Sequence, residues 1–162
     1  MASTRAAADE LSRMVPAGAW MGVHRMSLLQ TAAEVASEAI AARGLAPVTA
    51  LGMEAVAARA AHALRHNREL TYFGPVAATP GFAGALASTI SELRLNRVNS
   101  RDLAESGAPG RDLAALLKFY EQELSERGLA DAATVLELAS AAARAGAHRW
   151  DGLPLVLLDL PL

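Results

Sequence analysis

Residues whose types and spacing could support metal or acid–base chemistry are few in this sequence. His62 and His66 lie four positions apart, a spacing that places both rings on one face of a helix and can chelate a metal. Position 63 is Ala, where the H-E-x-x-H metalloprotease motif has Glu, and no carboxylate stands out as a third ligand. We therefore expect two partly exposed helix histidines and no metal site.

Other catalytic arrangements are also missing from the sequence. The chain has no cysteine, which excludes disulfides, thiolate metal sites and cysteine nucleophiles within it. Neither a phosphate-binding GxxxxGK[ST] or GxGxxG loop nor a G-x-S-x-G nucleophile elbow occurs, and the carboxylates form no convincing acid/base pair. We predict no active site and no bound cofactor for this chain.

Basic residues offer a different chemistry, the binding of phosphate. The formal net charge is −2, so any attraction to nucleic acid has to come from a local patch. Two basic stretches are candidates, the first of which lies on one helix face: Arg59, His62, Arg65 and His66 with Arg68 just beyond, and Arg94, Arg97 and Arg101. Each arginine could contact a DNA backbone without reading sequence, or the stretches could be ordinary solvated faces.

The elements that must position these residues are helices. Hydrophobic residues make up 52% of the chain but aromatic residues only 4%, and alanine fills the difference, which favours a mainly α fold. Helical periodicity and capping residues predict helices over 4–14, 27–43, 51–67, 80–96, 100–105, 111–127 and 131–145. Thr79 and Pro80 are expected to begin the fourth of these helices, and Gly44, Gly128 and Gly146 to end three of them.

The helix over 111–127 shows the clearest amphipathic pattern. Leu113, Leu116, Leu117, Tyr120 and Leu124 are predicted to face inward, and Asp112, Glu121, Gln122, Ser125 and Glu126 to face solvent. Between the predicted helices, residues 70–76 (LTYFGPV) form an aromatic connector without a helical pattern.

Short strands are expected at the two ends of the helical part, over 19–24 and within 153–160. The apolar run 155–158 (LVLL) is typical of a buried strand that needs neighbours on both sides, so we expect the chain to be a piece of a larger protein. No signal peptide or membrane-spanning run is present, which predicts a cytoplasmic protein with no membrane partner.

Several of these segments together resemble a known family. Residues 4–11 (TRAAADEL) are similar to motif Ia of superfamily 1 helicases of the UvrD/Rep/AddB type, and residues 20–28 (WMGVHRMSL) look like motif Ib. The helix pair from Phe119 to Asp131 and the run that ends at Asp159 are similar to the approach to motif II and its Asp. The central run 70–82 resembles the AddB-like branch of helicase-like nucleases that act in double-strand-break repair and recombination.

The resemblance implies an architecture and a role. Residues 31–146 would form a helical subdomain of the 1B type, framed by residues 1–30 and 147–162 as parts of the 1A sheet. The chain would contribute to binding single-stranded or forked DNA, beside the other domains of its parent or a partner nuclease or helicase subunit. Thr4, Arg5 and Ser27 would be the DNA-facing positions of motifs Ia and Ib. Arg59, Arg65 and Arg94 are candidates on charge placement alone.

The departures from the family pattern argue against catalysis by this chain. A working motif II has Asp followed by the Glu that polarises the attacking water, but Asp159 is followed by Leu160. The P-loop would lie upstream of residue 1, so ATP and Mg²⁺ are implied only for the parent family. A helical protein-interaction or dimerisation module without a DNA role remains the alternative.

Overall fold

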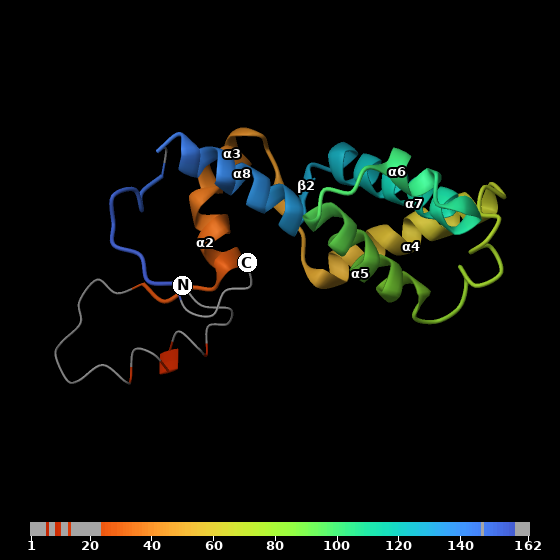
Figure 1. The fold of residues 1–162 in the computed structure, drawn as a ribbon, viewed down its shortest axis with the longest axis horizontal. Coiled ribbons are helices and arrows are strands. Elements are labelled where there is room, and N and C mark those ends of the chain that lie inside the picture. Colours follow the sequence, from red (N-terminus) through yellow and green to blue (C-terminus); the bar gives the residue numbers. More distant parts are fainter. Residues whose placement is uncertain (1–5, 7–8, 11–12, 14–23, 147, 158–162) are drawn as a thin grey trace. The chain divides into compact units, whose positions relative to one another are not determined.

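A computed structural model describes residues 6, 9, 10, 13, 24–146 and 148–157 of the chain. These residues are mainly helical, as the composition predicts (Figure 1). The helices are α2 (Leu28–Val35), α3 (Ser37–Ala42), α4 (Ala50–His66), α5 (Phe82–Leu95), α6 (Ser100–Ala104), α7 (Gly107–Glu126) and α8 (Ala132–Arg144). Two short strands, β1 (Ala46–Pro47) and β2 (Leu129–Ala130), pair in parallel, with Ala46 opposite Leu129.

The chain divides into two compact units. The central unit comprises Arg43–Thr134, and the terminal unit comprises the residues up to Ala42 together with those from Val135 onward. The boundaries expected from the resemblance, 1–30 and 147–162 against 31–146, concern a family architecture and stay a prediction.

The central unit is built on α4, which packs against α5 and α7, while α6 packs on α7. Small side chains on α4 (Ala57, Ala60 and Ala61) are almost completely buried and allow the neighbouring helices to approach closely. Larger side chains from the partner helices, above all Ile90, Leu116 and Tyr120, fill the space beside them. The inward face predicted for 111–127 is therefore confirmed at Leu116, Leu117, Tyr120 and Leu124, which are all buried.

Local capping explains where several helices begin. The Ser27 side chain accepts the Gln30 amide at the start of α2, and the Gln30 side chain accepts the Ser27 amide in return. Thr49 caps α4 in a similar way through the Gly52 amide, and Asp131 accepts the Thr134 amide at the start of α8. Ser27 and Asp131, the first residues of the helices predicted over 27–43 and 131–145, thus act as the caps of α2 and α8.

Three boundaries differ from the sequence prediction. The helix predicted over 27–43 is interrupted at Ala36, between α2 and α3. Helix α7 begins at Gly107 rather than Arg111. Pro109 is compatible with this earlier start because it lies in the first turn of the helix, where a backbone N–H has no partner within the helix. Helix α5 begins at Phe82 after Gly81, and the Thr79 hydroxyl donates to the Val76 carbonyl instead of capping the helix.

The predicted strands need a larger correction. Residues 153–157 belong to no helix or strand, and the other residues of the two expected strands lie outside the described part, except His24, which is also in neither. A strand is defined by its ladder with a neighbour, so an apolar run such as 153–157 does not specify one alone. The strands of the described part are β1 and β2, where the sequence analysis expected none.

The terminal unit holds α2, α3 and the part of α8 from Val135 onward. Ala32, Ala36, Ile40, Leu138 and Ala139 are buried within it. The rings of His24 and Trp150 meet edge to face with centroids 4.4 Å apart, and the Arg149 guanidinium lies 4.5 Å from the Trp150 ring centroid. None of the described helices is both long and apolar enough to cross a bilayer.

Candidate nucleic-acid interface

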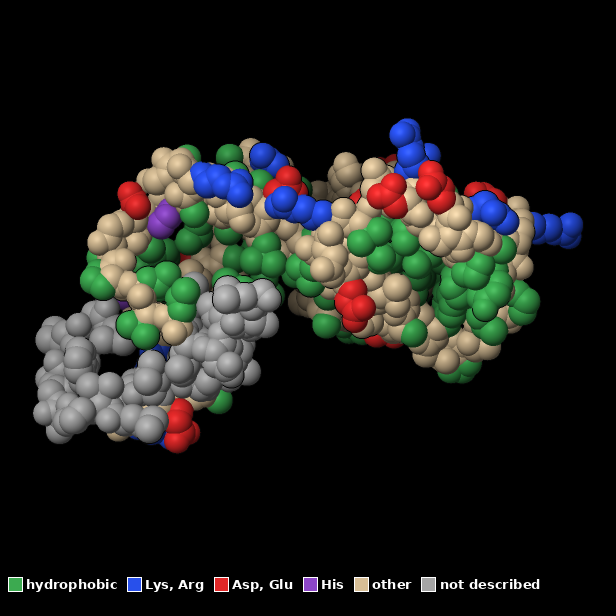
Figure 2. Space-filling model, viewed as in Figure 1, with side chains coloured by type: hydrophobic (Ala, Val, Ile, Leu, Met, Phe, Trp, Pro, Cys, Tyr) green, Lys and Arg blue, Asp and Glu red, His purple; other side chains and the backbone are tan. Residues whose placement is uncertain are grey.

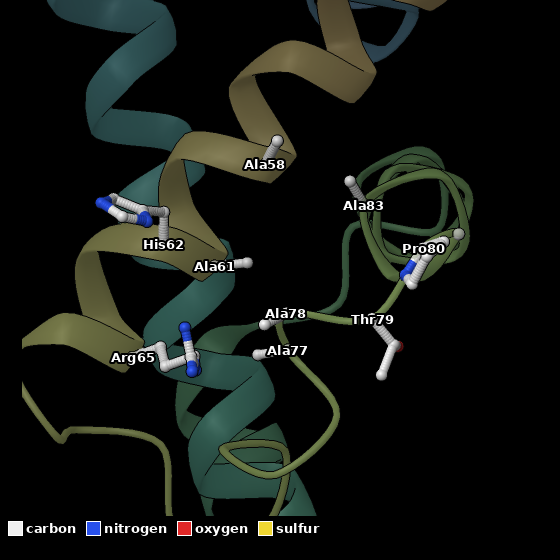
Figure 3. A pocket seen from close by; sticks show the side chains of 10 residues that line it. Ala58, Ala61, His62, Arg65, Ala77, Ala78, Thr79, Pro80 and Ala83 are labelled. Atoms are coloured by element: carbon white, nitrogen blue, oxygen red, sulfur yellow. The ribbon is translucent and has the colours of Figure 1, made fainter.

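A pocket of about 250 Å³ lies in the central unit between α4 and the segment that leads into α5. One wall comes from α4 and the other from residues 77–83, and five of the ten lining residues are alanines; Thr79, Pro80 and Gly81 also line the pocket. Figure 3 shows His62 and Arg65 on the α4 side, across from Pro80 and Ala83. The pocket therefore offers a ligand few chemical groups. Its walls are small and largely apolar, and the nitrogen-containing side chains of His62 and Arg65 lie on the α4 side.

Arg65 and His62 keep their hydrogen-bonding groups available. Both residues are exposed, and neither side chain makes a hydrogen bond or ion pair with the described part of the protein. They occupy adjacent turns of α4 because residues three apart lie on one helix face. The guanidinium can thus offer several donors to an oxygen-rich ligand that approaches the pocket.

Arg59, one of the other candidate arginines, is engaged within the fold. Its Nε donates to Glu123 Oε2 at 2.9 Å and its Nη2 to Glu123 Oε1 at 3.3 Å, while Arg127 Nε donates to the same carboxylate at 2.7 Å. The Glu123 carboxylate is almost buried, and hydrogen bonds from Arg59 and Arg127 hold its pKa below the usual value despite burial. Arg59 therefore neutralises the charge of the Glu123 carboxylate on α7.

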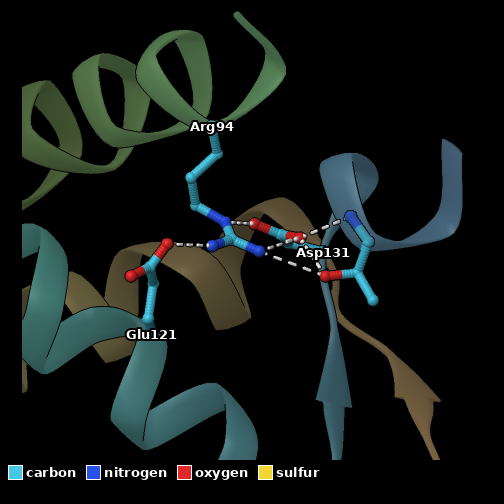
Figure 4. A network of polar contacts seen from close by, with 4 residues as sticks. Arg94, Glu121 and Asp131 are labelled. Carbon is cyan, nitrogen blue, oxygen red and sulfur yellow. Dashed lines mark hydrogen bonds and ion pairs between the residues drawn. The ribbon is translucent and has the colours of Figure 1, made fainter. Parts of the chain in front are cut away.

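Arg94 is still more firmly engaged. Its guanidinium donates to Asp131 at 2.6 and 3.2 Å, to Glu121 at 2.6 Å and to the Thr134 hydroxyl at 3.1 Å (Figure 4). Burial alone would raise the pKa of Asp131, but the Arg94 and Thr134 hydrogen bonds outweigh it and the pKa lies below its usual value. The network joins α5, α7 and the start of α8, so Arg94 has a structural role.

The charges of this network affect the pKa of Tyr120. Its side chain is 1% exposed, and burial together with the negative charge of Asp131 raises its pKa to about 12. The phenol therefore stays neutral across the physiological range and serves as a core residue.

The remaining sequence-predicted residues fall elsewhere. Ser27 caps α2 in the terminal unit, where its hydroxyl accepts the Gln30 amide. Thr4, Arg5 and Asp159 lie outside the described residues. Of the candidate residues that the structure describes, Arg65 and its neighbour His62 line the pocket of the central unit.

His62 and His66 are stacked along α4, with ring centroids 6.2 Å apart and an interplanar angle of 17°. Among the described residues, no group of three or more His, Cys, Asp and Glu side chains is arranged to hold a metal ion. The pair thus lies as two exposed helix histidines beside Arg65.

No family model, curated protein or solved structure matches the chain. A function for the chain is therefore inferred from the chemistry and placement of its own residues.

One polar contact that shapes this region was not predicted from the sequence. Asp112, predicted to face solvent, is 2% exposed, and its carboxylate accepts the amides of Thr71, Tyr72 and Phe73 and the Thr71 hydroxyl at 2.8–3.1 Å. Burial would raise its pKa, but these four hydrogen bonds lower it below its usual value. The carboxylate fixes the aromatic connector, which runs on into the pocket wall at 77–81. A signal was present, because three consecutive amides in a non-helical segment require acceptors.

Charges on the face seen in Figure 2 are mixed. Figure 2 shows Lys and Arg side chains distributed among Asp and Glu on the visible face, and they do not gather there into one large patch. An interface with a polyanion would therefore depend on a few locally unpaired arginines.

Proposed function

We propose that this chain is a DNA-binding, non-catalytic component that contacts the phosphate backbone of single-stranded or forked DNA through the α4 face at Arg65. The setting implied by the resemblance is a helical 1B-like subdomain of a UvrD/AddB-like helicase or nuclease in double-strand-break repair and recombination. ATP and Mg²⁺ would be handled by other parts of such a parent.

One observation carries the proposal: among the candidate arginines of the described part, Arg65 is exposed, unpaired and beside a pocket. Arg59 and Arg94 are bonded to carboxylates, so their charges are largely neutralised locally. An unpaired guanidinium beside small apolar side chains can make charge-assisted bonds to a phosphate without first breaking an ion pair.

The test is a titration of fluorescent single-stranded and forked oligonucleotides at several salt concentrations. Wild-type protein is expected to bind with an affinity that falls steeply as salt rises, because phosphate contacts release counterions. Arg65→Ala is expected to weaken binding about threefold to tenfold and to reduce the log–log salt slope by about 0.7 on single strands.

Lys118→Ala is the matched control, since Lys118 is exposed on α7, has no ion pair with the described residues and does not line the pocket. It removes the same unit of charge and should leave the salt slope within error of wild type. Absence of binding by wild-type protein at low salt would refute the DNA proposal. Equal slopes for the Arg65 variant and wild type would remove Arg65 from the interface.

An alternative is supported by the terminal unit. Leu153, Leu155, Val156 and Leu157 are each 55–64% exposed, and such apolar runs often lie at protein–protein contacts. A helical interaction or dimerisation module would show a concentration-dependent mass by light scattering. Replacement of Leu155 and Leu157 by Ser would abolish this dependence and leave DNA affinity unchanged.

A further inference from the structure

Tyr72 is an aromatic side chain held at the surface of the central unit. It is 57% exposed, whereas Tyr120 in the same unit is 1% exposed. Its hydroxyl makes no hydrogen bond with the described residues, and its ring lies roughly perpendicular to that of Phe73, with a centroid distance of 5.0 Å and an interplanar angle of 87°. Much of the ring is therefore available to a ligand.

The backbone that carries this ring is held in place. The Tyr72 amide donates to Asp112 Oδ2 at 2.8 Å, and the amides on both sides donate to the same buried carboxylate. The next side chain, Phe73, packs toward the core, with its ring 5.9 Å from that of Phe82. An exposed aromatic on a fixed backbone loses little conformational freedom when it binds, which favours affinity.

Two arginines are connected to Tyr72, one through the chain and one through Asp112, and both could bind phosphate. Arg68 precedes it by four residues, and Arg111 is the immediate neighbour of Asp112, which binds the Tyr72 amide. Both arginines are exposed, and neither makes an ion pair with the described residues. Figure 1 shows the connector as the loop beyond the C-terminal end of α4, next to α7, and the residues that follow it, 77–81, form the pocket wall opposite Arg65.

We propose that Tyr72 is a stacking platform for a nucleobase of single-stranded DNA, with Arg68 and Arg111 contacting the flanking phosphates. This inference rests on the proposed function and specifies its ligand. Every base has a π-face, so stacking of this kind tolerates any sequence. Bases in a duplex are already stacked on their neighbours, so the site selects single strands or the open arm of a fork.

The experiment compares wild-type protein, Tyr72→Phe and Tyr72→Ala on a short oligo(dT) and on the same oligomer with abasic positions. Tyr72→Phe keeps the ring and should bind oligo(dT) within twofold of wild type. Tyr72→Ala should bind it about 5-fold to 150-fold more weakly with the salt slope unchanged, because the lost contact is not ionic. On the abasic oligomer the three proteins should bind equally.

A second measurement reports on stacking directly. Tyr72→Trp places a fluorophore at the site, and its emission should be quenched by oligo(dT) but not by the abasic oligomer, after subtraction of the wild-type signal from Trp20 and Trp150. Urea unfolding of each variant confirms that the fold is retained, since the side chain replaced is exposed.

The outcomes separate this inference from the function on which it rests. Salt-dependent binding of wild-type protein with no loss in Tyr72→Ala overturns the stacking platform and leaves the backbone contact in place. An equal loss on intact and abasic DNA also overturns it, because the ring would then act without a base. No binding by wild-type protein overturns both.

Discussion

Asp112 gives the sharpest test of how the fold supports the candidate interface. Its buried carboxylate accepts four hydrogen bonds from Thr71, Tyr72 and Phe73, and we consider the variant Asp112→Ala, which removes all four. A hydrogen bond to a charged group contributes about 1.5–3 kcal/mol, and an amide left without a partner in the interior costs about 1–3 kcal/mol.

The expected effect is smaller than the sum of these terms. Thr71 and Tyr72 are exposed, so water can satisfy their amides once the carboxylate is gone, whereas Phe73 is half-buried and its amide is harder to hydrate. We expect Asp112→Ala to lower the free energy of unfolding by about 3–4 kcal/mol, which is a large share of the stability of a typical domain.

The assay is equilibrium urea unfolding followed by circular dichroism. Asp102→Ala is the matched control, because Asp102 is exposed in the short helix α6 and its side chain makes no hydrogen bond or ion pair with the described residues; its loss should cost about 0.5 kcal/mol or less. A loss below about 1 kcal/mol for Asp112→Ala would refute the reasoning, since the carboxylate would then not hold the connector.

The pH dependence of stability provides an independent check on the same residue. The pKa of Asp112 is lower in the folded than in the unfolded protein, so the carboxylate stabilises the fold above its unfolded pKa of about 3.9 and loses that effect as pH falls through the folded pKa. Glu123 and Asp131 act in the same direction. The free energy of unfolding should therefore fall below about pH 4, and less steeply in Asp112→Asn, which removes one titrating group.

Two further substitutions test the packing of the central unit, each against a control. Arg94→Ala should cost about 3 kcal/mol in urea unfolding, because it leaves Asp131 buried and unpaired, whereas exposed Arg97→Ala should change stability by about 0.5 kcal/mol or less. Gly110→Ala should be destabilising by more than about 2 kcal/mol, since the new methyl would meet the Leu103 carbonyl oxygen at 2.0 Å where α6 packs on α7. Gly84→Ala in α5 meets nothing closer than 3.5 Å and should be neutral or stabilise by up to about 1 kcal/mol through helix propensity. Similar stabilities for the two glycine variants would contradict the close approach at Gly110.

Much of the helical framework could be predicted from the sequence because its signals are local. The start of α4 follows from Thr49, whose hydroxyl caps the helix, and the end of α7 from Gly128, whose φ of 61° suits glycine. Both depend on a residue and its neighbours within one turn. The buried face of α7 likewise repeats with the helical period, so its leucines and Tyr120 were identified correctly.

The polar interior could not be predicted in the same way because its partners lie far apart in the sequence. Asp112 is 41 residues from Thr71, and Arg94 is 37 residues from Asp131. On a helical wheel, Asp112 is simply a charged residue near the start of a helix, and the usual expectation for such a residue is exposure. Only the folded chain shows that the connector needs its carboxylate.

These buried carboxylates also determine which arginines remain for a ligand. Glu123 binds Arg59, and Asp131 with Glu121 binds Arg94, so two of the three arginines that charge placement proposed are used to hold α4, α5 and α7 together. Asp112 has no arginine partner because backbone amides and the Thr71 hydroxyl satisfy it, and the neighbouring Arg111 remains unpaired within the described residues. The connector is thus held by a contact that takes up no positive charge, and Arg65, Arg68 and Arg111 keep exposed guanidinium groups without an ion pair to the described residues.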